Sequence, residues 1–307
     1  FDSHAINHSA FVVASMGAGK SFFVNYLVSN YFEAGAMIRI MDIGGSYKKN
    51  TKMYDAKYLD FAKDREMCIN PFTNIYEPEF DLPVIESIVA QMAYSASDEE
   101  PEETELTLIQ NAVEWAYAQK KNDADIDAVH NYLSSYPMYA HEEVHSIENK
   151  EKLINLAHTL AFNIREFTTE GRYGRYFNGR SNFDISKDEF AVLELEYLKP
   201  QKSLFKVATL QILNAVTQDL YLSDRSRPRM IIIDECWQFM KEGSLLKKVI
   251  EEAFRRSRKY NAGIIIITQS VLDLIQFGSI GDVIKGSSAF QFFLESPHFE
   301  KAKAEKL

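Results

Sequence analysis

Near its start the chain reads Phe11-Val12-Val13-Ala14-Ser15-Met16-Gly17-Ala18-Gly19-Lys20-Ser21. The first residues are apolar, and most are aromatic or β-branched, which predicts a buried strand. The small residues that follow allow a loop whose backbone N–H groups face inward, and Gly-Lys-Ser is typical of the start of a helix that binds phosphate. The stretch therefore predicts the strand, loop and helix of an α/β nucleotide-binding fold.

This loop is predicted to bind Mg-ATP. The nucleotide-binding residues are expected to be Ser15, Met16, Gly17, Ala18, Gly19, Lys20, Ser21 and Phe22. Lys20 would reach the β- and γ-phosphates, and the hydroxyl of Ser21 would bind Mg²⁺. The usual pattern has glycine where Ala14 stands, and alanine fits there only if its φ angle is negative. A chance Gly-Lys-Ser is the alternative, and the apolar strand directly before it argues against chance.

A second apolar stretch, 229–233, is followed by Asp234 and Glu235. Two adjacent carboxylates at the end of a buried strand are unfavourable unless a metal ion or hydrogen bonds compensate them. We expect Asp234 to hold Mg²⁺ through water and Glu235 to act as the general base toward the attacking water. The alternative is a strand that simply runs into solvent, which the phosphate-binding loop in the same chain makes less plausible.

A third strand, predicted at 263–268, ends in Gln269 and Ser270. In nucleoside triphosphatases with a catalytic glutamate, a strand usually lies between the phosphate-loop strand and the acidic strand. A polar residue at its end then contacts the γ-phosphate or the attacking water. Gln269 fits this sensing role, although it would also fit a plain loop. Three strand ends that meet at one phosphate site predict an ATP hydrolase.

The wider pattern predicts an α/β fold with a mainly parallel central sheet. Apolar runs indicate strands at 10–14, 37–41, 190–195, 230–233, 263–268 and 290–294. Helices are expected at 22–33, 204–222 and 245–260. Between 79 and 167 the apolar residues fall at helical spacing, which predicts an all-helical subdomain inserted into a sheet domain formed by residues 1–78 and 168–307.

Composition narrows the class of protein. A formal net charge of −10 argues against a general duplex-DNA binder, which usually presents a broad basic surface. The two cysteines form no metal-binding pattern, and the pair His141 and His145 lacks the setting of a zinc site. No apolar run approaches the ~20 residues needed to cross a bilayer, so any role at a membrane would be peripheral. Because the chain begins almost directly at a strand, we expect it to be part of a longer protein.

Two further motifs leave alternatives open. The basic run 255–259, which contains Arg258, fits a solvated helix face, an arginine finger that acts on a neighbouring subunit, or a channel-facing patch. The stretch Asp42-Ile43-Gly44-Gly45-Ser46 fits a turn that faces the site as well as a purely structural turn.

Taken together, the motifs resemble those of the TraC/VirB-type ATPases of bacterial conjugation and type IV secretion. The likeness follows the chain in order through Gly-Lys-Ser-Phe-Phe at 19–23, Asp42-Ile-Gly-Gly-Ser-Tyr, Asn70-Pro-Phe, Gly171-Arg-Tyr-Gly-Arg-Tyr-Phe-Asn-Gly, Asp234-Glu-Cys-Trp, Arg258-Lys-Tyr-Asn-Ala-Gly and Thr268-Gln-Ser. Gly-Lys-Ser alone is unspecific, whereas the combined series is highly specific.

The resemblance implies a RecA-like P-loop ATPase of the HerA/FtsK superfamily with a helical insertion. It implies that ATP hydrolysis drives pilus assembly and substrate transfer, in a hexamer or related ring at the cytoplasmic face of the bacterial inner membrane. A further N-terminal domain would dock on proteins of the inner-membrane complex. The family's roles fall on Lys20 and Ser21 for phosphate and Mg²⁺, Asp234 and Glu235 for metal and base, Gln269 for sensing, and Arg258 as one candidate finger.

Two other functions remain as alternatives. One is a DNA-pumping coupling protein or translocase of the same superfamily, which the acidic balance of the chain disfavours. The other is a nucleotide-dependent assembly module that does not hydrolyse ATP, which the presence of Glu235 disfavours.

Overall fold

The computed structural model describes residues 7–15, 17–62, 66–97, 99–138, 147–222, 225–235 and 245–295. The chain divides into two compact units. The first comprises residues 1–64, 185–199 and 213–307, and the second comprises residues 65–184 and 200–212.

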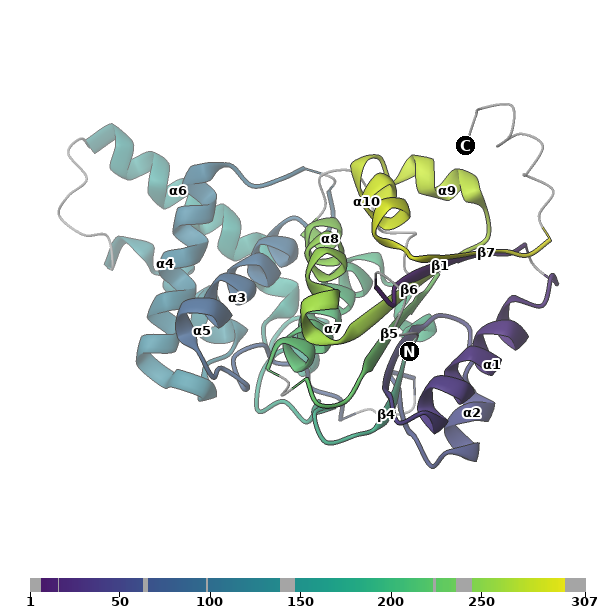
Figure 1. The fold of residues 1–307 in the computed structure, drawn as a ribbon. Helices are drawn as coiled ribbons and strands as arrows, with labels where there is room; N and C mark the ends of the chain where they lie inside the picture. Colours follow the sequence, from purple (N-terminus) through teal and green to yellow (C-terminus); the bar gives the residue numbers. More distant parts are fainter. Residues whose placement is uncertain are drawn as a thin grey trace. The chain divides into compact units, whose positions relative to one another are not determined.

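The first unit is built on a seven-stranded sheet with the strand order β3-β4-β2-β5-β6-β1-β7 (Figure 1). Its strands are β1 (Ala10–Val13), β2 (Met37–Asp42), β3 (Lys57–Asp60), β4 (Phe190–Glu194), β5 (Arg229–Asp234), β6 (Ala262–Thr268) and β7 (Phe290–Phe293). Every neighbouring pair is parallel, so all carboxyl ends lie at one edge. The prediction of an α/β fold with a mainly parallel sheet is confirmed, and β6 lies between β1 and β5 as expected.

Helices cover both faces of this sheet. The helices of the first unit are α1 (Lys20–Glu33), α2 (Lys48–Met53), α8 (Leu245–Ser257), α9 (Val271–Gln276), α10 (Ser279–Ser287) and the second half of α7 (Lys202–Tyr221). Figure 1 shows α1 and α2 on one side of the sheet and α8, α9 and α10 on the other. On the first side, Val24 and Val28 of α1 pack in one buried cluster with strand residues such as Val12 and Ile40. Burial on both faces explains why the central strands are continuously apolar.

The edge strand β3 was not predicted. Its sequence, Lys-Tyr-Leu-Asp, has charged ends, and all four residues are only partly buried. β3 pairs with β4 alone among the described strands. An edge strand of this kind lacks the apolar run by which the central strands were recognised.

The second unit is helical, and no strand is found among its described residues. Its helices are α3 (Pro78–Ala93), α4 (Glu103–Lys120), α5 (Ile126–Ser134), α6 (Ile147–Ile164) and the first half of α7. Helix α5 is capped at its amino end by Asp125, whose side chain accepts the N–H of Ala128 at 3.0 Å. The limits of this unit are wider than the predicted insert at 79–167, and that division of the chain stays a prediction.

Short 3₁₀ helices complete the described structure, at η1 (Lys121–Asp123), η2 (Tyr136–Met138), η3 (Arg165–Phe167), η4 (Gly174–Tyr176), η5 (Glu196–Leu198) and η7 (Arg258–Tyr260). None of the helices in the described ranges is both long and apolar enough to span a membrane.

Buried charges connect α7 to the sheet. The Oδ2 atom of Asp219 lies 3.3 Å from Nη2 of Arg39 and 3.8 Å from Nε of Arg229. Burial lowers the pKa of the Arg39 guanidinium, and Asp219 opposes this shift. One carboxylate therefore compensates two guanidinium groups in a buried environment.

We expect Asp219→Ala to lower the free energy of unfolding by about 3–5 kcal/mol, because it leaves two buried cations without their carboxylate. Urea unfolding followed by circular dichroism measures this change. The control is Asp282→Ala on the exposed side of α10, where we expect a change within about 0.5 kcal/mol. Equal stabilities of the two variants would contradict the importance of the ion cluster.

Candidate nucleotide-binding site

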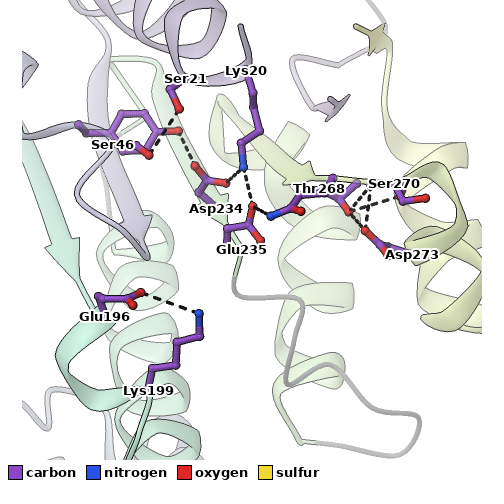
Figure 2. Close-up of polar contacts among 12 residues, drawn as sticks. Lys20, Ser21, Ser46, Glu196, Lys199, Asp234, Glu235, Thr268, Ser270 and Asp273 are labelled. Carbon is purple, nitrogen blue, oxygen red and sulfur yellow. Dashed lines mark hydrogen bonds and ion pairs between the residues drawn. The ribbon is translucent and has the colours of Figure 1, made fainter. Parts of the chain in front are cut away.

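A pocket of about 500 Å³ opens at the edge of the sheet where the strands end. Its walls come from the phosphate loop with the first turn of α1, from the ends of β5 and β6, and from the segments that follow β2 and β4. The residues that line it are Ser15, Gly17, Gly19, Lys20, Ser21, Phe22, Ile43, Gly44, Ser46, Glu196, Lys199, Asp234, Glu235 and Gln269. Figure 2 shows the polar side chains of these segments.

The phosphate loop is held at its entrance by backbone hydrogen bonds. The N–H of Ala14 donates to the carbonyl of Thr268 at 3.1 Å, and both the N–H and the hydroxyl of Ser15 donate to the carbonyl of Glu295. Ala14 is not among the described residues with a positive φ angle, so the alanine fits where the usual pattern has glycine. Gly17 and Gly19 have φ angles of +84° and +81°, which strain any residue with a Cβ. Met16, predicted to bind nucleotide, lies outside the described residues.

Lys20 lies between the two acids at the end of β5 (Figure 2). Its Nζ is 3.1 Å from Oδ1 of Asp234 and 2.6 Å from Oε1 of Glu235. Burial acts to lower the pKa of Lys20, but the two carboxylates outweigh it and raise the pKa. Burial raises the pKa of Asp234, whose side chain is 1% exposed, and Lys20 only partly offsets this shift. Both shifts reflect two desolvated carboxylates that share one ammonium group.

Gln269 contacts the same acid from the end of β6. Its Nε2 donates to Oε1 of Glu235 at 2.9 Å, so this one oxygen receives both Gln269 and Lys20. The structure thus brings together the residues expected from the three strand ends, and their chemical roles stay predictions. Glu235 has a φ angle of +57°, a conformation that is uncommon for a residue with a side chain and recurs at functional sites.

The other predicted residues lie in different settings. The Ser21 hydroxyl faces the Ser46 hydroxyl at 3.5 Å, and Phe22 stands at the pocket wall with 83% of its surface exposed. Arg258 is not in the pocket of its own chain. It begins η7, before the amino end of β6, whereas Gln269 follows the carboxyl end of the same strand. A seven-residue strand separates the two ends by about 20 Å, so Arg258 lies far from the pocket of its own chain.

The acids at the pocket carry more negative charge than Lys20 compensates, which fits the addition of a divalent cation together with nucleotide. Mg²⁺ is typically bound by one or two carboxylates plus substrate phosphates and water, rather than by a cage of protein ligands. No cluster of three or more His, Cys, Asp or Glu side chains able to hold a metal ion occurs in the described part of the chain. His141 and His145 lie outside the described residues. Ser21 and Asp234 are the side chains suited to Mg²⁺.

Comparison with known proteins agrees with this geometry. The family model of the TraG P-loop domain matches residues 2–306. The chain belongs to the TraG P-loop domain family. The resemblance to TraC/VirB-type ATPases that the motifs indicated is thereby confirmed, and it is supported by two further similarities.

Protein TraC of Escherichia coli (strain K12) is 24% identical to this TraG P-loop domain over 307 residues. The alignment covers 98% of the chain and 34% of TraC, so the chain spans about a third of the length of that relative. The structure of VirB4 of Thermoanaerobacter pseudethanolicus matches with a TM-score of 0.77 and 17% identity, over 98% of this chain and 82% of that one.

The plasmid coupling protein TrwB in complex with ADP and Mg²⁺ matches with a TM-score of 0.61 and 14% identity, over 91% of this chain and 68% of TrwB. At these identities, the similarities to VirB4 and TrwB establish the RecA-like P-loop fold.

Sequence reasoning missed several residues of this TraG P-loop domain site. The hydroxyl of Tyr47, which is fully buried, donates to Oδ2 of Asp234 at 3.2 Å. The amide of Asn25 donates to the carbonyl oxygens of Ser21 and Ser46. The Asp42-Ile-Gly-Gly-Ser turn was the available signal, because it suggested a turn that faces the site.

A further acid, Asp42, lies buried at the end of β2. Burial, together with the charges of Glu194 and Asp234, raises the pKa of Asp42 to about 8, and the backbone N–H groups of Tyr47 and Ser46 only partly oppose the shift. Asp42 therefore binds a proton in the folded protein over a range of pH in which an unfolded aspartate is ionised.

We expect Asp42→Asn to stabilise the domain relative to the wild type, increasingly as the pH rises from about 4 to about 8. Across this range the folded wild type binds more protons than the unfolded chain, so its stability falls by up to about 1.4 kcal/mol per pH unit from this group. Thermal unfolding in EDTA at several pH values measures the difference, which should level off above pH 8. A pH-independent difference between the two proteins would contradict the raised pKa.

Proposed function

We propose that this domain hydrolyses Mg-ATP to energise a bacterial conjugation or type IV secretion machine, in pilus assembly and substrate transfer. The observation that carries the proposal is the contact of Lys20 and Gln269 with one oxygen of Glu235, beside the phosphate loop. These side chains come from the first turn of α1 and from the ends of β5 and β6. Family membership and the similarity to TraC support the biological setting.

The present contacts suggest how nucleotide would engage the site. The triphosphate would bind to the backbone N–H groups at the start of α1, where the helix dipole favours negative charge. Lys20 would exchange its carboxylate partners for the β- and γ-phosphates. Glu235 would then be free to take a proton from the attacking water, while Gln269 keeps that carboxylate oriented.

Ser21 and Asp234 would hold the Mg²⁺ ion, which supplies positive charge at the phosphoryl oxygens when it is bound. The hydrogen bond from Tyr47 fixes one oxygen of Asp234. The orientation of Asp234 is therefore set by the protein before any ligand enters.

Partners and location follow from the same proposal. The domain would work in a homo-oligomer, a hexamer in the full protein, docked on inner-membrane complex proteins at the cytoplasmic face of the membrane. Arg258 would act as an arginine finger in trans, because it lies at the opposite end of β6 from its own pocket. Arg255 and Arg256 instead form ion pairs with Glu251 and Glu252 one turn earlier on α8.

A DNA-pumping coupling protein is the second candidate, which the similarity of fold to the coupling protein TrwB favours. The two candidates differ in their response to nucleic acid. Turnover that rises severalfold with added DNA, and DNA binding that weakens steeply with salt, would favour the coupling protein. Turnover unaffected by DNA would favour the secretion ATPase.

We expect Glu235→Gln to bind ATP with near-wild-type affinity while its turnover falls by a factor of about 100 or more, because the amide cannot accept the proton from water. Lys20→Ala should lose nucleotide binding, hydrolysis or both, since it removes the cation at the phosphates. Phosphate release and equilibrium binding of a fluorescent ATP analogue measure the two effects. A Glu235→Gln variant as fast as a clearly active wild type would show that the domain uses another base. A wild type no faster than background, and no faster than Glu235→Gln, would show a nucleotide-dependent assembly module.

We expect turnover per chain to rise with protein concentration in the wild type. In Arg258→Ala it should stay low, about 100-fold below the wild-type rate at high concentration. The reason is that a finger supplied in trans requires a neighbouring copy. Phosphate release measured across a dilution series, alongside sedimentation, tests this dependence. The control is Lys285→Ala on α10, because Lys285 is not among the residues that line the pocket, whereas Lys199 is. A concentration-dependent rise in Arg258→Ala equal to that of the wild type would exclude this residue as the finger.

A further inference from the structure

The carboxylate of Glu194, the last residue of β4, accepts hydrogen bonds from three separate segments. Its Oε1 accepts the N–H of Gly44 at 3.2 Å and that of Glu196 at 2.8 Å. Its Oε2 accepts the N–H of Gly45 at 2.7 Å and the hydroxyl of Tyr58 at 3.2 Å. The residue is only 5% exposed, so this is a buried side chain whose two carboxyl oxygens both accept hydrogen bonds.

The turn after β2 is shaped to receive this side chain. Gly44 and Gly45 have φ angles of +114° and +71°, which residues with a Cβ rarely adopt. Successive N–H groups in such a conformation point to the same side and form a concavity that binds anions. Here the carboxyl group of Glu194 accepts these N–H groups, so an internal side chain contacts a turn that lines the pocket.

The far end of the same turn reaches the two residues suited to Mg²⁺. The hydroxyls of Ser46 and Ser21 lie 3.5 Å apart, and the amide of Asn25 donates to the carbonyl oxygens of both serines, at 3.2 Å and 2.7 Å. The next residue, Tyr47, donates its hydroxyl to Asp234. Figure 2 shows Ser46 and Ser21 beside Asp234. One turn therefore contacts Ser21 on α1 and Asp234 on β5.

We propose that Glu194 is a positioning residue of the nucleotide site, which holds the Gly44–Gly45 turn so that Ser46 and Tyr47 align Ser21 and Asp234 for Mg²⁺. This inference rests on the proposed function, because it assumes that Mg-nucleotide binds in this pocket. Glu194 itself does not line the pocket and acts through the turn. Partners that orient metal ligands in this way typically change metal affinity 10–100-fold when they are removed.

Glu194→Gln tests the inference with little change in shape. The amide retains one oxygen acceptor but places an NH₂ group against a backbone N–H donor, which should release one side of the turn. We expect the affinity for fluorescent ADP in EDTA to stay within about twofold of the wild type. The gain in affinity on adding Mg²⁺ should fall about 10-fold or more. Titration of Mn²⁺ into the ADP complex, followed by electron paramagnetic resonance, should show a matching loss of metal affinity.

Two variants serve as companions to this measurement. Glu33→Gln is the matched control, because its exposed carboxylate also accepts a tyrosine hydroxyl, that of Tyr54, but lies at the far end of α1. It should leave both affinities unchanged. Tyr47→Phe removes only the hydrogen bond to Asp234 at the other end of the turn, and should reproduce the selective loss of Mg²⁺-dependent affinity. This second variant keeps the inference testable if Glu194→Gln does not fold.

The outcomes separate this inference from the proposed function. Equal losses of affinity in EDTA and in Mg²⁺ would show that Glu194 supports the fold in general, and unchanged affinities in both would show that the turn does not need it. Either result overturns the inference while leaving the proposed function in place. Failure of the wild type to bind ADP under any condition would overturn the proposed function, and the inference with it.

Discussion

One ammonium group, that of Lys20, holds two buried carboxylates at the edge of the sheet. Parallel strands have their carboxyl ends at the same edge of the sheet. The pairing of β5 with β6 and of β6 with β1 therefore places Asp234 and Glu235 near the phosphate loop. Two desolvated acids side by side would otherwise take up a proton or move apart. The other contacts of the site stabilise the same two acids. Lys20 follows directly after the phosphate loop, Gln269 donates a hydrogen bond to Glu235, and Tyr47 donates one to Asp234.

The sheet could be predicted largely because its central strands are buried on both faces. Strands such as 262–268 are continuously apolar, and this pattern gave six strands to within a few residues. β3 was not predicted because its four residues are only partly buried and form no apolar run. It forms a strand through its pairing with β4. The parallel direction of the strands was predicted from the alternation of strands and helices along the chain.

The site residues could be predicted only where they belong to short sequence motifs or follow a predicted strand. Lys20, Asp234 and Glu235 belong to short motifs with a fixed spacing, and Gln269 follows from the expected strand order. Glu194 has no such signal, because its role depends on the pairing of β2 with β4, which brings residues 150 apart into contact. Pairing between strands distant in sequence is what short motifs do not encode.

If the site binds Mg-ATP as proposed, the ion pairs of Lys20 would also link the binding of phosphate to the binding of a cation. A phosphate group that took over Lys20 would leave Asp234 and Glu235 without the charge that compensates them. Two unit charges 4 Å apart repel by about 4 kcal/mol at an effective dielectric constant of 20. A divalent cation that entered with the phosphates would offset such a repulsion, so each ligand would favour the binding of the other. The coupling would arise because Lys20 is the ammonium group that contacts both acids. The other lysine that lines the pocket, Lys199, pairs with Glu196 instead.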